Sequence, residues 1–339
     1  MRASLAAARF LFASARPGGW RTGTRTPTEL RLGDERLRAW RYTPSRPRWT
    51  VLALHGLTLR GADDPRMDAV CHALAFAGCT VLAPELPDTA RLRVGSADVE
   101  RIAGLLTAPG GLHSRGDPGA DRGAIGIFAP SFSAAMALRA AAQTATQVTA
   151  VCAVGACGSV SETVRHLLEA PGADPYGRLV LFRNFGPPAL GWRGALCEAL
   201  DAWLADDSLR RTAPAFPAAR AALSDGDGAL VDDLLRGGWH ARALAPLLLA
   251  QAAPVLRALD VRPVAADVRA QVTLLHGTDD AVIPFTESVA LAGWLPDAHL
   301  CVTRLLTHGD TRLDAAVLPQ VARLHAAMTA WFAGLGRAA

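Results

Sequence analysis

The sequence predicts an α/β protein built on a mostly parallel, doubly wound sheet. Short, mainly apolar runs, such as 49–54 and 148–154, alternate along the chain with helical patterns of apolar residues. Strands that are apolar on both faces are typical of parallel sheets covered by helices on either side. The alternation stops over 159–265, where leucine- and alanine-rich helical patterns are broken by proline and glycine, and it resumes afterwards.

Turn signals and periodicity place the elements before this interruption. Residues 28–32 and 36–42 alternate around Gly33-Asp34, which predicts a β-hairpin. The pattern over 66–77 has mostly helical spacing and ends at Gly78, a helix stop signal. The remaining strands are expected at 49–54, 80–83, 124–128 and 148–154, and the remaining helices at 99–106 and 132–142.

After the interruption we expect strands at 272–275 and 300–306 and a helix at 288–294. A final helix carries Val321, Leu324, Met328 and Trp331, with Pro319 in its first turn. The predicted organisation is a basic amphipathic segment (1–27), a core formed by 28–158 and 266–339, and a helical cap (159–265) inserted after the sixth strand.

Composition excludes several classes of protein. Of the 339 residues 50% are hydrophobic, which is too apolar for a disordered chain. The six cysteines form no C-x-x-C pair, so neither a zinc ribbon nor a disulfide framework is indicated. We expect no metal and no cofactor. The longest uncharged run, 140–161, holds glutamines and threonines that a membrane-spanning helix would avoid.

The net charge of +4 is concentrated at one end of the chain. Residues 1–50 hold eleven arginines against three acidic residues, so the remaining chain is acidic and no nucleic-acid partner is expected. Residues 1–16 lack acidic residues and mix arginine with leucine and phenylalanine. They fit a secretory signal, a transit peptide, or an amphipathic helix on the domain or on a membrane surface. We favour the helix and a cytoplasmic location. Residues 1–16 could make a peripheral membrane contact, and we expect the whole segment 1–27 to be dispensable for activity.

The strongest local signal is a serine between a buried strand and an alanine-rich helix. Residues 125–135 read IGIFAPSFSAA, with Ser131 at the turn. A nucleophile on such a sharp turn needs small residues two positions before and after it, and these are Ala129 and Ser133. Ser133 also has small neighbours, but it would fall half a turn into the helix.

Four motifs together resemble the α/β-hydrolase-fold serine hydrolases, over about residues 28–335. His55-Gly56-Leu57 follows the third strand, where that family has its oxyanion motif, and Ser131 stands at the nucleophile turn. The segment 275–284 (LHGTDDAVIP) resembles the family's acid segment, and Thr307-His308-Gly309 follows the last strand. The order serine, aspartate, histidine is that of the family.

The resemblance implies a Ser131–His308–Asp280 triad, with oxyanion donors at the backbone N–H groups of Leu57 and Phe132. Asp279 is the alternative acid, but spacing from Gly277 favours Asp280. His55, His276, His299 and His325 are interpreted as structural or uninvolved.

The expected activity is hydrolysis of a carboxylic or thiol ester of a largely apolar small molecule. Acyl transfer, C–C bond hydrolysis and a catalytically silent binding protein remain alternatives, and the oligomeric state is open. The insertion has more large apolar residues than one sheet face needs, so some should line a pocket over the serine. They include Leu179, Phe182, Phe185, Trp192, Trp203 and 247–249.

Overall fold

The computed structural model describes residues 1–16, 23–107, 112, 124–144, 148–307, 310–311 and 318–337. The predicted α/β class is confirmed, with an eight-stranded sheet in the order β1-β2-β4-β3-β5-β6-β7-β8. Pairing is antiparallel from β1 through β2 to β4 and parallel from β4 onward. The strands are β1 (Thr24–Leu32), β2 (Glu35–Thr43), β3 (Trp49–Ala53), β4 (Cys79–Pro84), β5 (Ile125–Pro130), β6 (Val148–Val154), β7 (Gln271–Gly277) and β8 (Ala298–Thr303).

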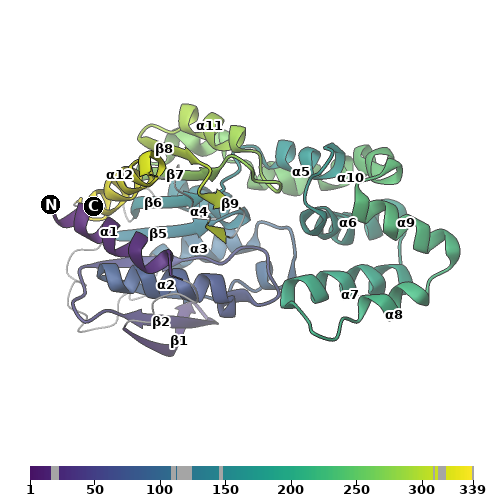
Figure 1. The fold of residues 1–339 in the computed structure, drawn as a ribbon, viewed down its shortest axis with the longest axis horizontal. Coiled ribbons are helices and arrows are strands. Elements are labelled where there is room, and N and C mark those ends of the chain that lie inside the picture. Colours follow the sequence, from purple (N-terminus) through teal and green to yellow (C-terminus); the bar gives the residue numbers. More distant parts are fainter. Residues whose placement is uncertain are drawn as a thin grey trace.

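Helices cover both faces of the sheet because successive residues of its buried strands point to opposite sides. Val51 and Phe128 belong to a core with α1 (Arg2–Ser14), α2 (Pro65–Ala77) and α12 (Leu318–Gly334). Leu52 and Ile127, their neighbours in sequence, belong to a core with α3 (Ala97–Thr107), α4 (Phe132–Gln143) and α11 (Phe285–Trp294). Figure 1 shows these helices around the strands.

Local signals in the sequence explain where α2 begins and ends. The Asp64 carboxylate accepts a hydrogen bond from the Arg66 N–H at the helix start, and Pro65 occupies the first turn. Gly78 ends the helix with a φ of 106°, a left-handed conformation that glycine adopts without steric cost.

The chain between β6 and β7 forms a helical insertion, as the sequence pattern predicted. Its helices are α5 (Val160–Glu169), α6 (Pro175–Leu190), α7 (Ala195–Leu209), α8 (Phe216–Ala221), α9 (Asp225–Arg236) and α10 (Trp239–Leu259). Figure 1 shows α6 to α9 at the end of the molecule opposite α1 and α12.

A buried arginine holds the insertion together. The Arg178 side chain donates hydrogen bonds to the carbonyl groups of Leu167, Ala173, Leu234 and Leu235, at 2.9 to 3.3 Å. These carbonyls lie at or just beyond the C-terminal ends of α5 and α9, where a cation is favourable. Desolvation lowers the pKa of this guanidinium.

The N-terminal segment packs onto the domain as helix α1. Phe10 is 6% exposed, and its ring lies 6.2 Å from that of Phe128 and 6.4 Å from that of Phe332. Because α1 buries core residues, removal of 1–27 would expose apolar surface on α2 and α12. It would also cut into β1, which starts at Thr24 and not at residue 28. The expectation that this segment is dispensable therefore neglects its packing.

Within the described residues, one helical stretch has the length and composition of a membrane span. It runs over Trp239–Asp267, with a mean hydropathy of 1.4 and 33% of the apolar window buried. A search for uncharged runs misses it because Arg242, Arg257 and Arg262 interrupt it. Its helix α10 contains Pro246 and Pro254 and contacts α5, α6 and α9, as a helix of a folded domain does.

Candidate active site

Ser131 lies between β5 and α4 in a backbone conformation that non-glycine residues rarely adopt. Its φ is 56° and its ψ is −134°. Such a conformation costs about 1–3 kcal/mol and is retained only where the surrounding structure imposes it. The Ser131 N–H donates to the carbonyl of Val154 at 2.6 Å, which joins the end of β5 to the end of β6. The side chain is thereby presented at the carboxyl edge of the sheet.

Ser133 is unsuited to nucleophilic attack. It is fully buried within the first turn of α4, and its hydroxyl donates to the carbonyl of Pro130 at 2.7 Å. Ser131 is partly exposed and lines a cavity that Ser133 does not reach. The geometry therefore distinguishes the two serines of the APSFS sequence.

The loop after β3 passes beside Ser131. A Cβ built on Gly56 would lie 3.8 Å from the Cβ of Ser131, so the two backbones are in close approach. His55 is buried, and its Nε2 accepts a hydrogen bond from the Leu86 N–H at 2.9 Å. Its Nδ1 therefore carries the proton and donates to the Gly56 carbonyl at 2.9 Å. Burial lowers the pKa of His55, which keeps the imidazole neutral and structural.

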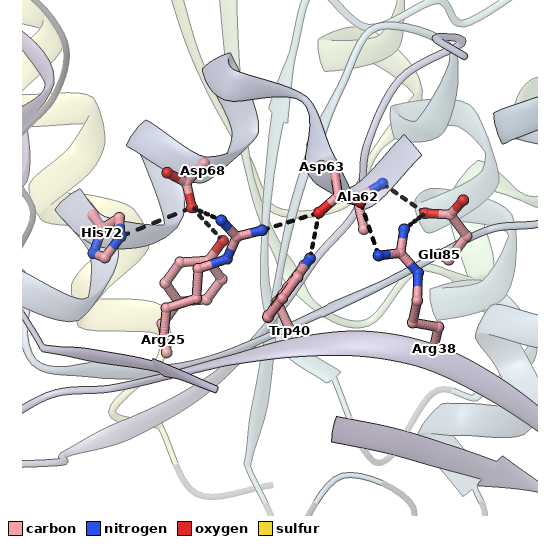
Figure 2. Close-up of polar contacts among 9 residues, drawn as sticks. Arg25, Arg38, Trp40, Ala62, Asp63, Asp68, His72 and Glu85 are labelled. Carbon is pink, nitrogen blue, oxygen red and sulfur yellow. Dashed lines mark hydrogen bonds and ion pairs between the residues drawn. The ribbon is translucent and has the colours of Figure 1, made fainter. Parts of the chain in front are cut away.

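A network of charged side chains fastens the continuation of this loop to the sheet. The Glu85 carboxylate accepts hydrogen bonds from the Ala62 N–H at 2.8 Å and from Arg38 at 3.0 Å. Asp63 accepts from Arg25, Arg38 and the Trp40 indole, as Figure 2 shows. Gly61 has a φ of 51°, and a Cβ there would lie 2.4 Å from the Glu85 carboxylate, so a side chain at this position would displace that carboxylate.

The helical insertion is hydrogen-bonded to the same loop from the other side. The Tyr176 hydroxyl donates to the Leu57 carbonyl at 3.2 Å. The Ser208 hydroxyl accepts from the Leu59 N–H at 2.9 Å, and Arg60 donates to the carbonyls of Ser208 and Leu209. Burial raises the pKa of Tyr176 to about 12, so the phenol is a hydrogen-bond donor at neutral pH. The backbone of Gly56 and Leu57 is thus held between Ser131 and the insertion.

Asp280 follows β7, and its side chain is 3% exposed. One carboxylate oxygen, Oδ1, accepts from the N–H groups of Val282 and Ile283 at 2.9 and 3.0 Å. The other, Oδ2, lies 3.5 Å from the Nε2 of His276. Asp279 is exposed and accepts from the Thr278 hydroxyl. Of the two neighbouring aspartates, Asp280 is the one whose orientation the backbone fixes.

His308, the expected base, lies outside the described residues. His276 is fully buried, with Nδ1 2.6 Å from the Ser288 hydroxyl and Nε2 2.8 Å from the Ile283 carbonyl. His299 is half exposed on β8, near Asp297. His325, on α12, lies 3.1 Å from the Ser4 carbonyl. The last strand of the main sheet, β8, ends at Thr303 instead of residue 306, and Leu306–Thr307 form the short strand β9.

Ser131 and Asp280 line the same cavity, which has a volume of about 1370 Å³. Its lining includes Ser131, Asp280 and the residues of both expected oxyanion donors, Leu57 and Phe132. This volume exceeds the range of about 300–1,000 Å³ of common small-molecule sites. Most of the remaining lining is apolar, and α1, α2, α5, α6 and α12 contribute a large part of it.

The insertion contributes to this cavity through residues other than those expected. None of the large apolar residues named from the sequence lines it. Leu179 and Phe182 are buried among the helices of the insertion, where Phe182 stacks on Trp192 with ring centroids 5.7 Å apart. The cavity is lined instead by smaller aliphatic residues on the faces of α5 and α6 that point the other way: Val160, Val164, Leu167, Val180 and Leu181.

Comparison with known proteins identifies the fold. No family model matches this sequence, and no curated protein matches it. Among solved structures, an esterase from Pyrococcus furiosus has 14% identity and a TM-score of 0.51, covering 91% of this chain and 92% of the esterase. The proline iminopeptidase of Mycobacterium smegmatis has 12% identity and a TM-score of 0.50, covering 91% of this chain and 98% of its own.

The acylaminoacyl peptidase of Pyrococcus horikoshii has 15% identity and a TM-score of 0.50 over 91% of this chain. This chain spans only 40% of that peptidase's length. The chain has the α/β-hydrolase fold.

Within the α/β-hydrolase fold, this chain departs from the glycine-rich form of the nucleophile turn. Ala129 and Ser133 stand where G-x-S-x-G has glycines, and both are fully buried. The extra atoms of Ser133 are accommodated because its hydroxyl bonds to the Pro130 carbonyl. Sequence reasoning did not identify Tyr176, Ser208 and Arg60, although Tyr176 is one of only two tyrosines in the chain.

Proposed function

We propose that this α/β-hydrolase is a serine hydrolase that cleaves a carboxylic or thiol ester of a largely apolar small molecule. Ser131 is the nucleophile, His308 the general base and Asp280 the acid that orients it. The backbone conformation of Ser131 is the observation that carries the proposal, because a strained serine at a strand–helix turn is the mark of a nucleophile elbow. The mainly apolar cavity around it supports an apolar substrate.

In this mechanism, His308 accepts the hydroxyl proton of Ser131 as Oγ attacks the ester carbonyl carbon. The resulting oxyanion accepts hydrogen bonds from the backbone N–H groups of Phe132 and Leu57. As the tetrahedral intermediate collapses, the C–O or C–S bond breaks and His308 returns the proton to the leaving alcohol or thiol. Water, activated by the same imidazole, then releases the acid and regenerates Ser131.

Several contacts support this assignment of roles. The Phe132 N–H lies at the start of α4, where backbone N–H groups lack intrahelical partners and the helix dipole favours negative charge. The Leu57 carbonyl, in the peptide unit after that of its N–H, accepts the hydrogen bond from Tyr176, which restrains the Leu57 backbone. Each oxyanion donor in such a site contributes about 10²–10³-fold to the rate. Asp280 is fixed by two backbone N–H groups.

Labelling with a fluorophosphonate tests the proposal. The probe phosphonylates an activated serine and should label the wild-type protein. Ser131→Ala should abolish labelling, whereas Ser133→Ala, which removes a neighbouring hydroxyl that is already hydrogen-bonded, should retain it. An unlabelled wild-type protein, or Ser131→Ala labelled as strongly as wild type, would overturn the proposal.

A further inference from the structure

Helix α1 presents an apolar stripe on the side that faces away from the domain. Its inner face is buried against α2 and α12. Its outer face exposes Leu5 by 54% and Phe12 by 50%. The exposed apolar residues follow one another at helical spacing: Met1, Leu5, Ala8, Phe12 and Ala15. A helix packed on a globular domain normally turns polar residues outward, so this stripe indicates a further contact.

The charges on this helix are all positive. Arg2 and Arg9 on α1, and Arg16 just beyond its C-cap, are exposed and recur every seven residues beside the apolar stripe. The helix contains no acidic residue, and none precedes Glu29 in the chain. The guanidinium of Arg16 lies 4.6 Å from the centroid of the Phe12 ring. Apolar side chains flanked by arginines match the boundary of an anionic bilayer, where acyl chains lie beneath phosphate groups.

The cavity that contains Ser131 reaches this same surface. Five residues of α1, its C-cap and α12 both line the cavity and are exposed, and all five are apolar: Ala8, Phe12, Ala15, Leu318 and Ala322. Leu318 is 79% exposed. A second set of exposed lining residues is mostly charged: Pro65, Arg66, Asp207, Arg210, Asp279 and Ala281. Among the described residues, the cavity therefore has one apolar and one largely polar rim.

We propose that the outer face of α1, together with Leu318, docks on the surface of an anionic phospholipid bilayer. The apolar stripe inserts at the acyl boundary, and the three arginines bind lipid phosphates. The apolar rim would then admit an apolar ester directly from the membrane, while the charged rim faces water. This route of substrate entry rests on the proposed function, whereas the docking itself does not.

Vesicle co-sedimentation of the full-length protein tests the docking. We expect binding to vesicles of phosphatidylcholine and phosphatidylglycerol, weakened by salt, and much weaker binding to phosphatidylcholine alone. Leu5→Asp should reduce binding about tenfold or more, because it places a charge in the apolar stripe. The double variant Arg2→Gln, Arg9→Gln should reduce binding by a similar factor, because each arginine near the surface contributes about 1 kcal/mol. Leu247→Asp is the matched control, since Leu247 is 53% exposed on α10 of the helical insertion.

Binding of Leu5→Asp that equals wild type, or equal binding to neutral vesicles, would overturn the proposal. A dimer that Leu5→Asp dissociates, detected by light scattering without vesicles, would assign the stripe to a contact between copies of the chain. The Ser131→Ala protein should bind vesicles normally, so docking is measured even if the proposed hydrolysis fails. Leu5→Asp should slow hydrolysis of a long-chain ester embedded in anionic vesicles but leave hydrolysis of a short soluble ester unchanged.

Discussion

Tyr176 connects the helical insertion to Leu57, the residue that follows Gly56. Its hydroxyl is the donor to the Leu57 carbonyl, and the Leu57 N–H is the proposed oxyanion donor. The N–H and the carbonyl of Leu57 belong to adjacent peptide units, so Tyr176 is a positioning residue that acts on this N–H through the backbone conformation of Leu57.

Tyr176→Phe should lower kcat by about 2- to 10-fold, because one hydrogen bond contributes about 0.5–1.5 kcal/mol. KM and the thermal midpoint should change little, since the ring and its packing are retained. Steady-state kinetics on a soluble p-nitrophenyl ester measures the effect. A change confined to KM, or a fall in the melting temperature that accounts for the lost activity, would contradict a positioning role.

The neutral state of His55 makes stability depend on pH. Burial lowers its folded-state pKa below the ordinary value of about 6.5, so the unfolded chain binds a proton that the folded protein resists. The free energy of unfolding should therefore be fully retained above about pH 6.5 and fall as the pH drops toward the folded-state pKa.

The decrease in the free energy of unfolding that His55 causes is at most about 1.4 kcal/mol per pH unit. Denaturant unfolding of wild type and His55→Asn at pH 7.5, 6.5 and 5.5, roughly spanning the ordinary histidine pKa, measures it. His55→Asn should lose less stability on acidification than wild type. Parallel losses in the two proteins would show that His55 is not held neutral.

At the scale of elements, one buried arginine links α6 to the C-terminal ends of α5 and α9 within the insertion. Arg178 is 1% exposed and donates hydrogen bonds to carbonyl groups at the C-terminal ends of two helices. Nothing in the segment PYGRLVLF indicates that its arginine is buried, because arginine in a helix is usually exposed.

Arg178→Met should lower the free energy of unfolding by about 3 kcal/mol or more, because an unpaired buried carbonyl costs about 1–3 kcal/mol. Arg183→Met is the control on the same helix. The Arg183–Asp201 pair is substantially exposed, so its loss should cost less than about 1 kcal/mol. Equal changes in denaturant midpoint for the two variants would contradict the structural role of Arg178.

The core elements were largely predictable because their signals are local. The helical spacing over 66–77 and the stop at Gly78 predict α2 within a residue, and the mainly apolar run 148–154 predicts β6. The lining of the cavity was not predictable in the same way. Leu179 and Leu181 are both leucines on α6, and their different angular positions around the helix axis decide that Leu181 faces the cavity and Leu179 does not.

The candidate site was predictable in part for a similar reason. Ser131, Leu57 and Asp280 each follow a strand of a parallel sheet, and the carboxyl ends of such strands meet at one edge. Tyr176 and Ser208 reach that edge from an insertion whose docking no local pattern specifies.

At the scale of the whole molecule, the sheet, the insertion and α1 enclose one large cavity around Ser131. The sheet edge provides the reactive residues, the insertion covers them from one side, and α1 with α12 provides an apolar wall on the other. Substrate selection should therefore depend on apolar contacts from both walls, each contributing about 1–3 kcal/mol per methylene-sized change.

The central claim is that Ser131 becomes acylated during ester hydrolysis. The most direct measurement is mass spectrometry of the wild-type protein, quenched with acid during turnover of a long-chain p-nitrophenyl ester and digested. The account predicts the acyl mass on the peptide that contains Ser131, and no adduct in Ser131→Ala. Turnover without any acylated peptide, or an acyl group on a different residue, would contradict it.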